Sequence, residues 1–503
     1  MKKIFLLLSL LVTAAFSAAR IVATDGNDAN PGTLDSPLAT VIKAVSLSSP
    51  GDTILVRGGL YTGITTISIS KNGTAQKKYY LLAFPQERPV FDFSSQSLGQ
   101  RGFSLKADHW FIQGLEIKGA GDNGMEINRG SFNRIERCAF YENRDTGLQL
   151  SNGAAYNEII NCDSYYNADP PDYADADGFA PKLTVGTGNY FFGCRAWVNC
   201  DDGWDGYLRG ATDVTTTLEQ CWTWGNGYLA DGTDPGEKAN GNGFKMGGGD
   251  NSNQDQLMHH FILTRCLAFH NKSKGFDQNN NVGSMTLLQC TAYRNLDDNY
   301  RITKPLSAGQ SLRVTNCVSY DGGVSLAGFA VQQSNSWMAP FHVSGEDFIS
   351  LDPAWAAAPR RDDGRLPEIP FLHLADGSDL IDAGVIIDSG FSGTAPDLGA
   401  FEKPSHSHAG RMNKTPAGFH LAQNHPNPFN PSTAIRYHLD APCRVSLKIF
   451  DATGREIAVL VDSVKPAGEH CVTWYAGGLP AGVYLYRLQA GALTRMKKMI
   501  MVK

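Results

Sequence analysis

The stretch that decides the fold is Cys138-Ala-Phe-Tyr-Glu-Asn143, in which an aromatic residue follows the cysteine by three positions and an asparagine follows it by five. This pattern occurs seven times, with 24, 32, 27, 45, 24 and 27 residues between successive cysteines. Such spacings are typical of stacked repeats, in which each coil buries its apolar face only against its neighbours. The cysteines are Cys138, Cys162, Cys194, Cys221, Cys266, Cys290 and Cys317, the aromatics are Tyr141, Tyr165, Trp197, Trp224, Phe269, Tyr293 and Tyr320, and the asparagines are Asn143, Asn167, Asn199, Asn226, Asn271 and Asn295, with Gly322 in the last copy.

A second β-prone stretch in each copy opens with glycine and an apolar residue. The pairs are Gly147-Leu148, Gly178-Phe179, Gly203-Trp204, Gly243-Phe244, Gly275-Phe276 and Gly328-Phe329, with Asn299-Tyr300 in the sixth copy. Phe111 to Lys118 predicts a degenerate coil before the seven clear ones. The pattern predicts an all-β protein, a right-handed parallel β-helix, with the asparagines forming a ladder between coils.

Ten cysteines in an exported chain would ordinarily indicate disulfides. Seven of them share one phase of the repeat, so their side chains should point in parallel, whereas a disulfide needs Cβ vectors turned towards each other. We therefore expect buried thiols in this column. Cys443 and Cys471 lie outside the repeat and could pair, and Cys200 is off-phase and expected to be unpaired.

The chain divides into four segments. Residues 1–19 have two lysines, an apolar run and small residues, which predicts a secretory signal peptide. Residues 20–402 are expected to form the β-helix domain, with an N-terminal cap containing a short amphipathic helix at Leu38, Val41, Ile42 and Val45, and with final turns or an exit cap at 346–402. Residues 403–418 read as a linker, and residues 419–503 as a small antiparallel β-sandwich.

Composition excludes one class of partner. The 503 residues carry a formal net charge of −6, so nothing indicates nucleic-acid binding. We expect a monomer.

Two insertions, at 168–177 and 227–242, flank the third coil, and insertions in solenoids lie on a binding face. The repeat brings Asp177, Asp201, Asp202 and Asp205 onto two neighbouring coils, with Lys245 one coil beyond Asp205. Four carboxylates this close cannot all stay ionised without a cation. Oxygen ligands without Cys or His favour Ca²⁺ over zinc or copper. The alternatives are a solvated acidic turn and a surface lysine.

These residues resemble a known family. Asp175-Ala-Asp-Gly-Phe-Ala180, Asn199-Cys-Asp-Asp-Gly-Trp-Asp-Gly-Tyr207 and Gly241-Asn-Gly-Phe-Lys-Met-Gly247 are similar to the signature of the family 9 polysaccharide lyases, parallel β-helix pectate lyases that use Ca²⁺ and a lysine base. The resemblance covers about residues 25–320. It implies that Asp177, Asp201, Asp202 and Asp205 are Ca²⁺ ligands and that Lys245 is the base, with polyuronate (pectate) as substrate.

Other polar and aromatic residues could also face the groove. Asp277, Lys182, Lys238 and Arg209 could bind substrate carboxylates, but each is equally well explained as surface charge. Trp204 and Trp222 could stack on sugars. Trp224 occupies the aromatic position of the repeat, which predicts a core residue. His259-His260 has no zinc-type partner pattern, so we assign it no function.

The C-terminal segment carries a second resemblance. Asn427-Pro-Phe-Asn-Pro-Ser-Thr433, Val445 to Asp451, Leu479 to Tyr484 and the basic tail from Arg495 are similar to the sorting domains of type IX secretion substrates. This implies handling by the type IX machinery and a secreted or cell-surface location. A generic β-sandwich, which could bind carbohydrate, is the alternative.

The sequence therefore favours an exported Ca²⁺-dependent pectate lyase acting by β-elimination, most active at alkaline pH. A lyase for another uronic-acid polymer such as rhamnogalacturonan, and a non-catalytic β-helix adhesin or glycan-binding protein, stay open as alternatives. A hydrolase is weaker because it leaves Lys245 in the acid cluster unexplained.

Overall fold

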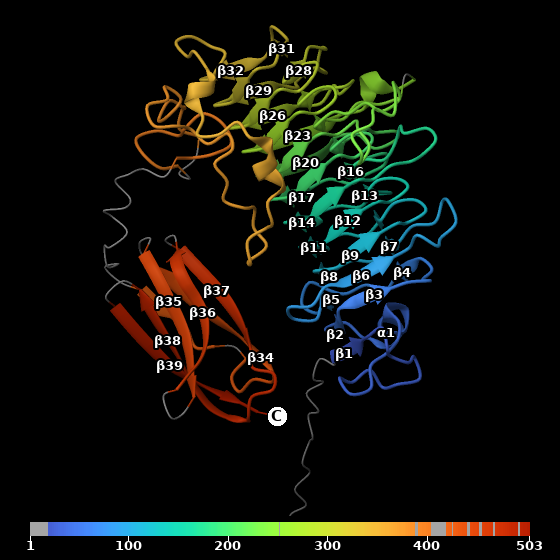
Figure 1. Ribbon diagram of the computed structural model, residues 1–503, viewed down its shortest axis with the longest axis vertical. Helices are drawn as coiled ribbons and strands as arrows, with labels where there is room; N and C mark the ends of the chain where they lie inside the picture. Colours follow the sequence, from blue (N-terminus) through green and yellow to red (C-terminus); the bar gives the residue numbers. More distant parts are fainter. Residues whose placement is uncertain are drawn as a thin grey trace, which may run out of the picture. The chain divides into compact units, whose positions relative to one another are not determined.

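The computed structural model describes residues 19–250, 252–387, 391–403, 419–424, 426–439, 443–451, 455–465, 468–490 and 493–502. The chain divides after Lys403 into two compact units. The first unit is a stack of coils, running from blue to yellow in Figure 1, and each full coil contributes one strand to each of three parallel sheets. The right-handed parallel β-helix predicted from the repeat is confirmed. Residues 1–18 of the predicted signal peptide, and most of the predicted linker, lie outside the described residues, and Ala19 opens the first strand.

Three sheets, named A, B and C here, run the length of the stack. Sheet A contains β1 (Ala19–Val22), β2 (Thr53–Val56), β5 (Tyr79–Ala83), β8 (Trp110–Gln113), β11 (Arg134–Glu136), β14 (Glu158–Ile160), β17 (Asn189–Phe192), β20 (Val214–Glu219), β23 (His259–Thr264), β26 (Met285–Leu288), β29 (Leu312–Thr315) and β32 (Val331–Gln333). Sheet B contains β3 (Gly59–Tyr61), β6 (Pro89–Asp92), β9 (Glu116–Lys118), β12 (Ala139–Tyr141), β15 (Asp163–Tyr165), β18 (Arg195–Trp197), β21 (Trp222–Trp224), β24 (Leu267–Phe269), β27 (Thr291–Tyr293) and β30 (Val318–Tyr320). Sheet C contains β4 (Ile67–Ile69), β7 (Phe103–Leu105), β10 (Met125–Asn128), β13 (Leu148–Ser151), β16 (Phe179–Pro181), β19 (Trp204–Asp205), β22 (Phe244–Lys245), β25 (Phe276–Asp277), β28 (Tyr300–Ile302) and β31 (Val324–Leu326). The predicted degenerate coil is present as β8 and β9.

The cysteine column lies inside the stack, as the repeat predicted. All seven thiols are buried and unpaired, and each Sγ donates a hydrogen bond to backbone carbonyls near it, as Cys162 does to the carbonyl of Ile135. Cys200 is also unpaired. The possible Cys443–Cys471 disulfide does not form: both thiols are free, one on β35 and one on β37 of different sheets.

The asparagine ladder is also confirmed. The backbone N–H and side-chain amide of each asparagine donate to Oδ1 of the asparagine in the next coil, for example from Asn199 to Asn226 at 3.1 and 3.0 Å. The ladder ends on Asn299, to which Asn295 donates, rather than on Gly322. These bonds satisfy backbone donors at a buried bend, where an unpaired N–H would be costly.

The aromatic residues three positions after the repeat cysteines form a column along sheet B, and the position of Trp224 in it differs from the prediction. In sheet B, side chains alternate between the inside and the outside of the coil, and Phe140 takes the inner position next to Tyr141. The aromatic rings therefore stack on the outer face of the sheet, with ring centroids 4.9 Å apart between Trp197 and Trp224. Trp224 is half-buried there and does not belong to the interior of the coil.

In the seventh coil the strand of sheet C begins earlier than predicted. Its strand β31 follows Gly323, whose carbonyl accepts a hydrogen bond from the N–H of Asn299. Gly323 thus takes the position predicted for Gly328, because the turn after Tyr320 is short. Phe329 is 44% exposed and does not open a buried strand.

Residues 341–402 do not extend the stack as final turns. The described residues of this segment, 341–387 and 391–402, contain no helix or strand apart from the 3₁₀ turns η2 (Gly345–Asp347) and η3 (Pro353–Ala357), and they pack on the outer face of sheet B. Phe371 contacts the rings of Phe269 and Tyr293 from this segment. The outward aromatic column offers an apolar surface that an end cap could not cover, so the segment folds back along the sheet.

The N-terminal cap and the second unit agree with the predicted elements. Helix α1 (Val41–Leu47) begins after Thr40, whose hydroxyl accepts from the N–H of Lys43, and it buries Val41 and Val45 but leaves Ile42 46% exposed. The short 3₁₀ turn η1 spans Gln254–Gln256. The described residues of the second unit form two antiparallel sheets: one holds β33 (Phe419–Leu421), β34 (Ser432–Leu439) and β37 (Gly468–Tyr475), and the other holds β35 (Cys443–Asp451), β36 (Glu456–Lys465), β38 (Gly482–Ala490) and β39 (Leu493–Met501). No helix among the described residues is long and apolar enough to cross a membrane.

Candidate active site

The predicted acids and lysine lie on three consecutive strands of sheet C and in the turns that lead into them. Phe179 of β16 pairs with Trp204 of β19, and Trp204 pairs with Phe244 of β22. These three rings are buried inside the coil, so the residue after each ring points outwards. Asp205 and Lys245 are paired neighbours in this register, as the repeat predicted.

Glycines before these strands allow the coils to approach closely. A Cβ on Gly203 would lie 2.0 Å from Thr223 Oγ1 and 2.7 Å from the carbonyl oxygen of Gly243. Only glycine fits, and the turn that carries Asp201 and Asp202 is therefore fixed against the next coil.

Three of the four predicted metal ligands converge. Asp177, Asp201 and Asp202 are buried, and each offers a carboxylate oxygen that lies within 4.8 Å of the others. Burial, which is the largest effect, raises the pKa of Asp177 and of Asp201 well above the usual value, and it also raises that of Asp202.

Backbone and amide donors hold these carboxylates in place. Asp177 Oδ1 accepts from the N–H of Asp202 at 3.2 Å, and Asp201 Oδ1 accepts from the N–H of Asn240 at 2.6 Å. Asp202 Oδ1 accepts from both the N–H and the side-chain amide of Asn242, at 2.7 and 2.9 Å. Asp202 Oδ2 is buried and accepts no well-oriented hydrogen bond, although an ammonium group lies nearby. Carboxylate oxygens are hard donors, and Asp202 Oδ2 is one that accepts no well-oriented hydrogen bond. The cluster therefore fits a divalent cation such as Ca²⁺.

Asp205 has a different environment. It is not in the group of converging oxygens found among the described residues. Its carboxylate lies between two ammonium groups, 3.3 Å from Lys245 Nζ and 3.7 Å from Lys182 Nζ. Burial would raise the pKa of Asp205, but Lys245 and Lys182 outweigh burial and hold it below its usual value.

Lys245 is the centre of the acidic cluster. Its Nζ lies 2.9 Å from Asp202 Oδ2 and 3.3 Å from Asp205 Oδ1. Burial alone would lower the pKa of Lys245, but the aspartates, Asp202 foremost, raise it well above its usual value. With the cluster unneutralised, Lys245 is an ammonium ion and not a base.

Lys182 lies within the site, although a surface charge explained it equally well in the sequence. It is buried, and its Nζ donates to Asp177 Oδ2 at 2.7 Å, so it is not a surface charge. Side chains two positions apart along a strand lie on the same face. Lys182 follows Ala180 by two positions and Ala180 lies beside Asp205, so the sequence could have placed Lys182 on the face that carries Asp205. Of the other residues considered, Asp277 is buried one coil beyond Lys245, whereas Lys238 forms an exposed ion pair with Asp172.

A cavity of about 410 Å³ opens over these residues. Its lining is mostly polar and runs from Lys245 in the fourth coil towards the earlier coils: Arg101, Asp122, Asn123, Asp145, Gln149, Ala174, Asp175, Lys182, Leu183, Asp205, Tyr207, Arg209 and Lys245. The predicted sugar-stacking role of Trp204 and Trp222 is wrong, because Trp204 lies inside the coil and Trp222 is covered by residues 341–402.

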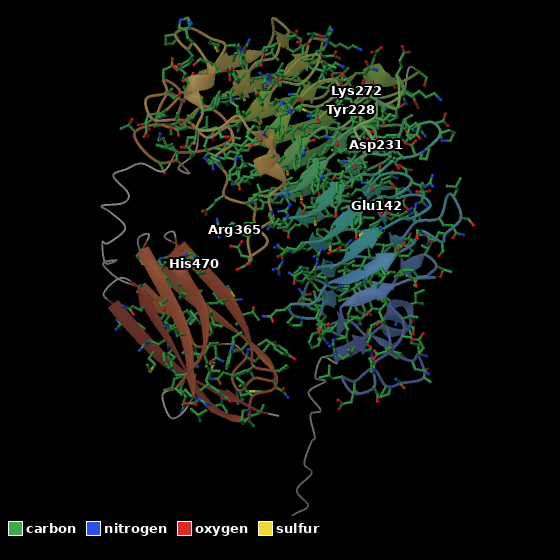
Figure 2. All side chains as sticks on the ribbon, viewed as in Figure 1. Glu142, Tyr228, Asp231, Lys272, Arg365 and His470 are labelled. Atoms are coloured by element: carbon green, nitrogen blue, oxygen red, sulfur yellow. The ribbon has the colours of Figure 1, made fainter. Side chains whose placement is uncertain are left out.

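The two insertions border the site. Ala174 and Asp175 of the first insertion line the cavity, and Asn240 of the second holds Asp201. Lys238 Nζ of the second insertion forms an exposed ion pair with Asp172 of the first at 2.6 Å, a kind of contact that contributes little to stability. Figure 2 shows Tyr228 and Asp231 of the second insertion together with Lys272 of the next coil, whose Nζ donates to the carbonyl of Gly236 at 2.6 Å.

Comparisons with known proteins agree with this geometry. Residues 20–329 match the family model described as Pel9A-like, right handed beta helix region, and residues 424–503 match the secretion system C-terminal sorting domain. The chain is 39% identical over 409 residues to a Dickeya chrysanthemi protein named pectate lyase L, covering 78% of this chain and 92% of that protein. It is 40% identical over 388 residues to pectate lyase L of Paenibacillus polymyxa, covering 72% and 83%.

Two solved structures are similar over most of the first unit. The crystal structure of pectate lyase Pel9A has a TM-score of 0.70 and 38% identity, and the match covers 77% of this chain and 98% of that one. A structure named rhamnogalacturonan lyase has a TM-score of 0.59 and 26% identity, with 71% and 96% covered.

Proposed function

The chain belongs to the Pel9A-like right-handed β-helix family and is a polysaccharide lyase, and from this premise we propose that it cleaves pectate by β-elimination with Lys245 as the base. One observation carries the assignment: the Lys245 amine, in a polar cavity, lies 3.3 Å from Asp205 and 2.9 Å from Asp202, and Asp202 belongs to the cluster of three converging aspartates.

Elimination across a uronate requires removal of the proton α to its carboxylate, which builds negative charge on a group that is already anionic. A bound divalent cation supplies a Lewis acid that stabilises such charge. Asp177, Asp201 and Asp202 would hold this cation, and Asp205, which faces the same cavity, is the fourth proposed ligand.

Lys245 must lose its proton before it can accept one from the substrate. The carboxylates around it hold its pKa up, foremost Asp202. Neutralising their charge weakens this attraction, so occupancy of the aspartates and alkaline pH both favour the amine form. Lys182 stays paired with Asp177 and offers the cavity a second positive charge for substrate carboxylates.

The test is an assay of polygalacturonate cleavage with Ca²⁺, followed by the ultraviolet absorbance of the unsaturated ends. Lys245→Ala should abolish the absorbance, and Lys238→Ala should leave it unchanged, since Lys238 forms only an exposed ion pair. Full activity of Lys245→Ala would refute the assignment of the base.

Rhamnogalacturonan is the second candidate substrate, favoured by the likeness to a solved rhamnogalacturonan lyase. Both polymers contain uronates, so the same base chemistry applies to either. Comparing kcat/KM on polygalacturonate and on rhamnogalacturonan decides between them.

Export is the remaining part of the proposal. The match of residues 424–503 to a secretion sorting domain supports a secreted or cell-surface enzyme. Residues 1–19 would supply the first, signal-peptide step.

A further inference from the structure

His259 lies directly behind the floor of the site. It is fully buried at the start of β23, one of the strands of sheet A, and its main chain is fixed on both sides by Asn281. The N–H of His259 donates to Asn281 Oδ1 at 3.1 Å, and its carbonyl accepts from Asn281 Nδ2 at 2.6 Å. The imidazole therefore has little freedom to move.

Both ring nitrogens of His259 have partners. Nδ1 lies 2.8 Å from the carbonyl oxygen of Gly206, and Nε2 lies 2.8 Å from Thr216 Oγ1. A carbonyl oxygen only accepts, so Nδ1 carries the hydrogen. Burial lowers the pKa of His259 to about 4, so the ring is neutral and Nε2 accepts from the hydroxyl of Thr216.

Gly206 is the residue between Asp205 and Tyr207, both of which line the cavity. The N–H of Gly206 donates to the carbonyl of Lys245 at 2.9 Å, while its own carbonyl accepts from His259. A Cβ at this position would lie 2.5 Å from Phe261 Cζ, so the peptide packs tightly against sheet A.

The same turn fixes the acid beside the base. The N–H of Tyr207 donates to Asp205 Oδ1 at 3.0 Å, and that oxygen lies 3.3 Å from Lys245 Nζ. The ring of Tyr207 lies with its centroid 6.0 Å from the same Nζ, and its hydroxyl donates to Asp250. A shift of the Gly206 peptide would therefore move Asp205 and Tyr207 relative to Lys245.

We infer that His259 is a positioning residue for the lyase reaction, which donates from Nδ1 to the Gly206 carbonyl and so sets the distance between Asp205 and Lys245. This inference rests on the proposed function, since it assigns Lys245 as the base. His259 itself touches neither the cavity nor the substrate. A displacement of about 1 Å at a reacting group can cost about 100-fold in rate, so a buried contact of this kind is enough to limit kcat.

Two amide variants separate the two ring contacts. In His259→Asn the side-chain amide can replace Nδ1 as the donor to Gly206, whereas in His259→Gln it reaches the Nε2 position and leaves the Gly206 carbonyl unpaired. Both variants lose the imidazole ring and its packing on Phe261. The unpaired Gly206 carbonyl should make His259→Gln the less stable of the two, so kcat is normalised to the folded fraction measured by urea unfolding. A purely structural role would then give equal kcat values for the folded enzyme in both variants.

We expect kcat on polygalacturonate to stay within about 3-fold of the wild type for His259→Asn and to fall about 10- to 100-fold for His259→Gln, with KM changed little in either. Equal kcat values in the two variants, or a loss that appears only in KM, would overturn the inference. Nitrogen-15 NMR of histidine-labelled wild-type protein gives a readout independent of activity: His259 should be neutral with the proton on Nδ1, and a proton on Nε2 refutes the contact. If the wild type cleaves no polyuronate, the proposed function fails, while the NMR result still decides whether His259 holds Gly206.

Discussion

Replacing Asp163 by asparagine tests how residues 341–402 are held on sheet B. The carboxylate of Asp163, on β15, binds two arginines: Arg195 Nε donates to it at 2.9 Å and Arg360 Nη2 at 2.6 Å. Arg195 also donates to the carbonyls of Ala356 and Ala358 at 3.0 and 2.8 Å. One partly buried acid therefore neutralises two cations that join the sheet to the segment covering it.

The magnitude follows from two independent arguments. Burial would raise the pKa of Asp163, but Arg360 and Arg195 outweigh burial and lower the pKa from 3.8 to about 2. At about 1.4 kcal/mol for each pKa unit, this corresponds to about 2 kcal/mol. Removing one partner of a buried ion pair costs about 3–5 kcal/mol, because the remaining charge is left uncompensated. We therefore expect Asp163→Asn to destabilise the packed segment by about 2–5 kcal/mol.

Urea unfolding and limited proteolysis both measure this loss. The urea midpoint should fall, and cleavage within residues 341–402 should be faster by at least about 25-fold, the factor that 2 kcal/mol gives when cleavage follows local opening. Asp172→Asn is the matched control, since it makes the same chemical change in an exposed ion pair and should leave both measurements unchanged.

The pH dependence gives a further check. Because the pKa of Asp163 is lower in the folded protein, its contribution is complete above about pH 4 and is lost as the pH falls towards 2. The difference in stability between the wild type and Asp163→Asn should shrink over this range. A variant as stable as the wild type at pH 7, or a difference that grows on acidification, would refute the reasoning.

Three further results are expected. Ca²⁺ should raise the melting temperature of the wild type relative to chelator, and Asp201→Asn should reduce this shift because it removes one of the converging carboxylates; an unchanged shift would exclude Asp201 as a ligand. The activity of the Ca²⁺-saturated enzyme should rise from neutral to alkaline pH, since Lys245 has to lose its proton before it can act as the base, and an acidic optimum in the pH–rate profile would contradict this. Gly203→Ala should destabilise the protein by about 1–3 kcal/mol through overpacking against Thr223, whereas Gly328→Ala, where a Cβ meets nothing within 4 Å, should be neutral in the same denaturation measurement.

The register of the site could be predicted because repeats convert sequence phase into position along the stack. The pairing of Asp205 with Lys245 follows from the glycine that opens each strand, without knowledge of any long-range contact. The buried thiols and the asparagine ladder were predictable for the same reason, since residues at the same position in successive repeats stack on one another.

Contacts outside the repeat were not predictable in this way. The packing of residues 341–402 on the aromatic column joins parts of the chain that share no period, as the Arg360–Asp163 pair shows. The prediction that Gly328 precedes the strand of the seventh coil was also wrong, because a short turn moves the start of that strand to Val324.

The sequence by itself determined the β-helix, the coil that carries the site, and the identity of the acids and the lysine on it, because these depend on local spacing within each repeat. Only the tertiary structure decided that Asp205 lies between two lysines apart from the other three acids, that Lys182 is buried among them, and that His259 holds Gly206 from behind. The physical reason is that these contacts depend on how turns of different length fold over and against the stack, which sets distances and charge environments that no repeat period contains.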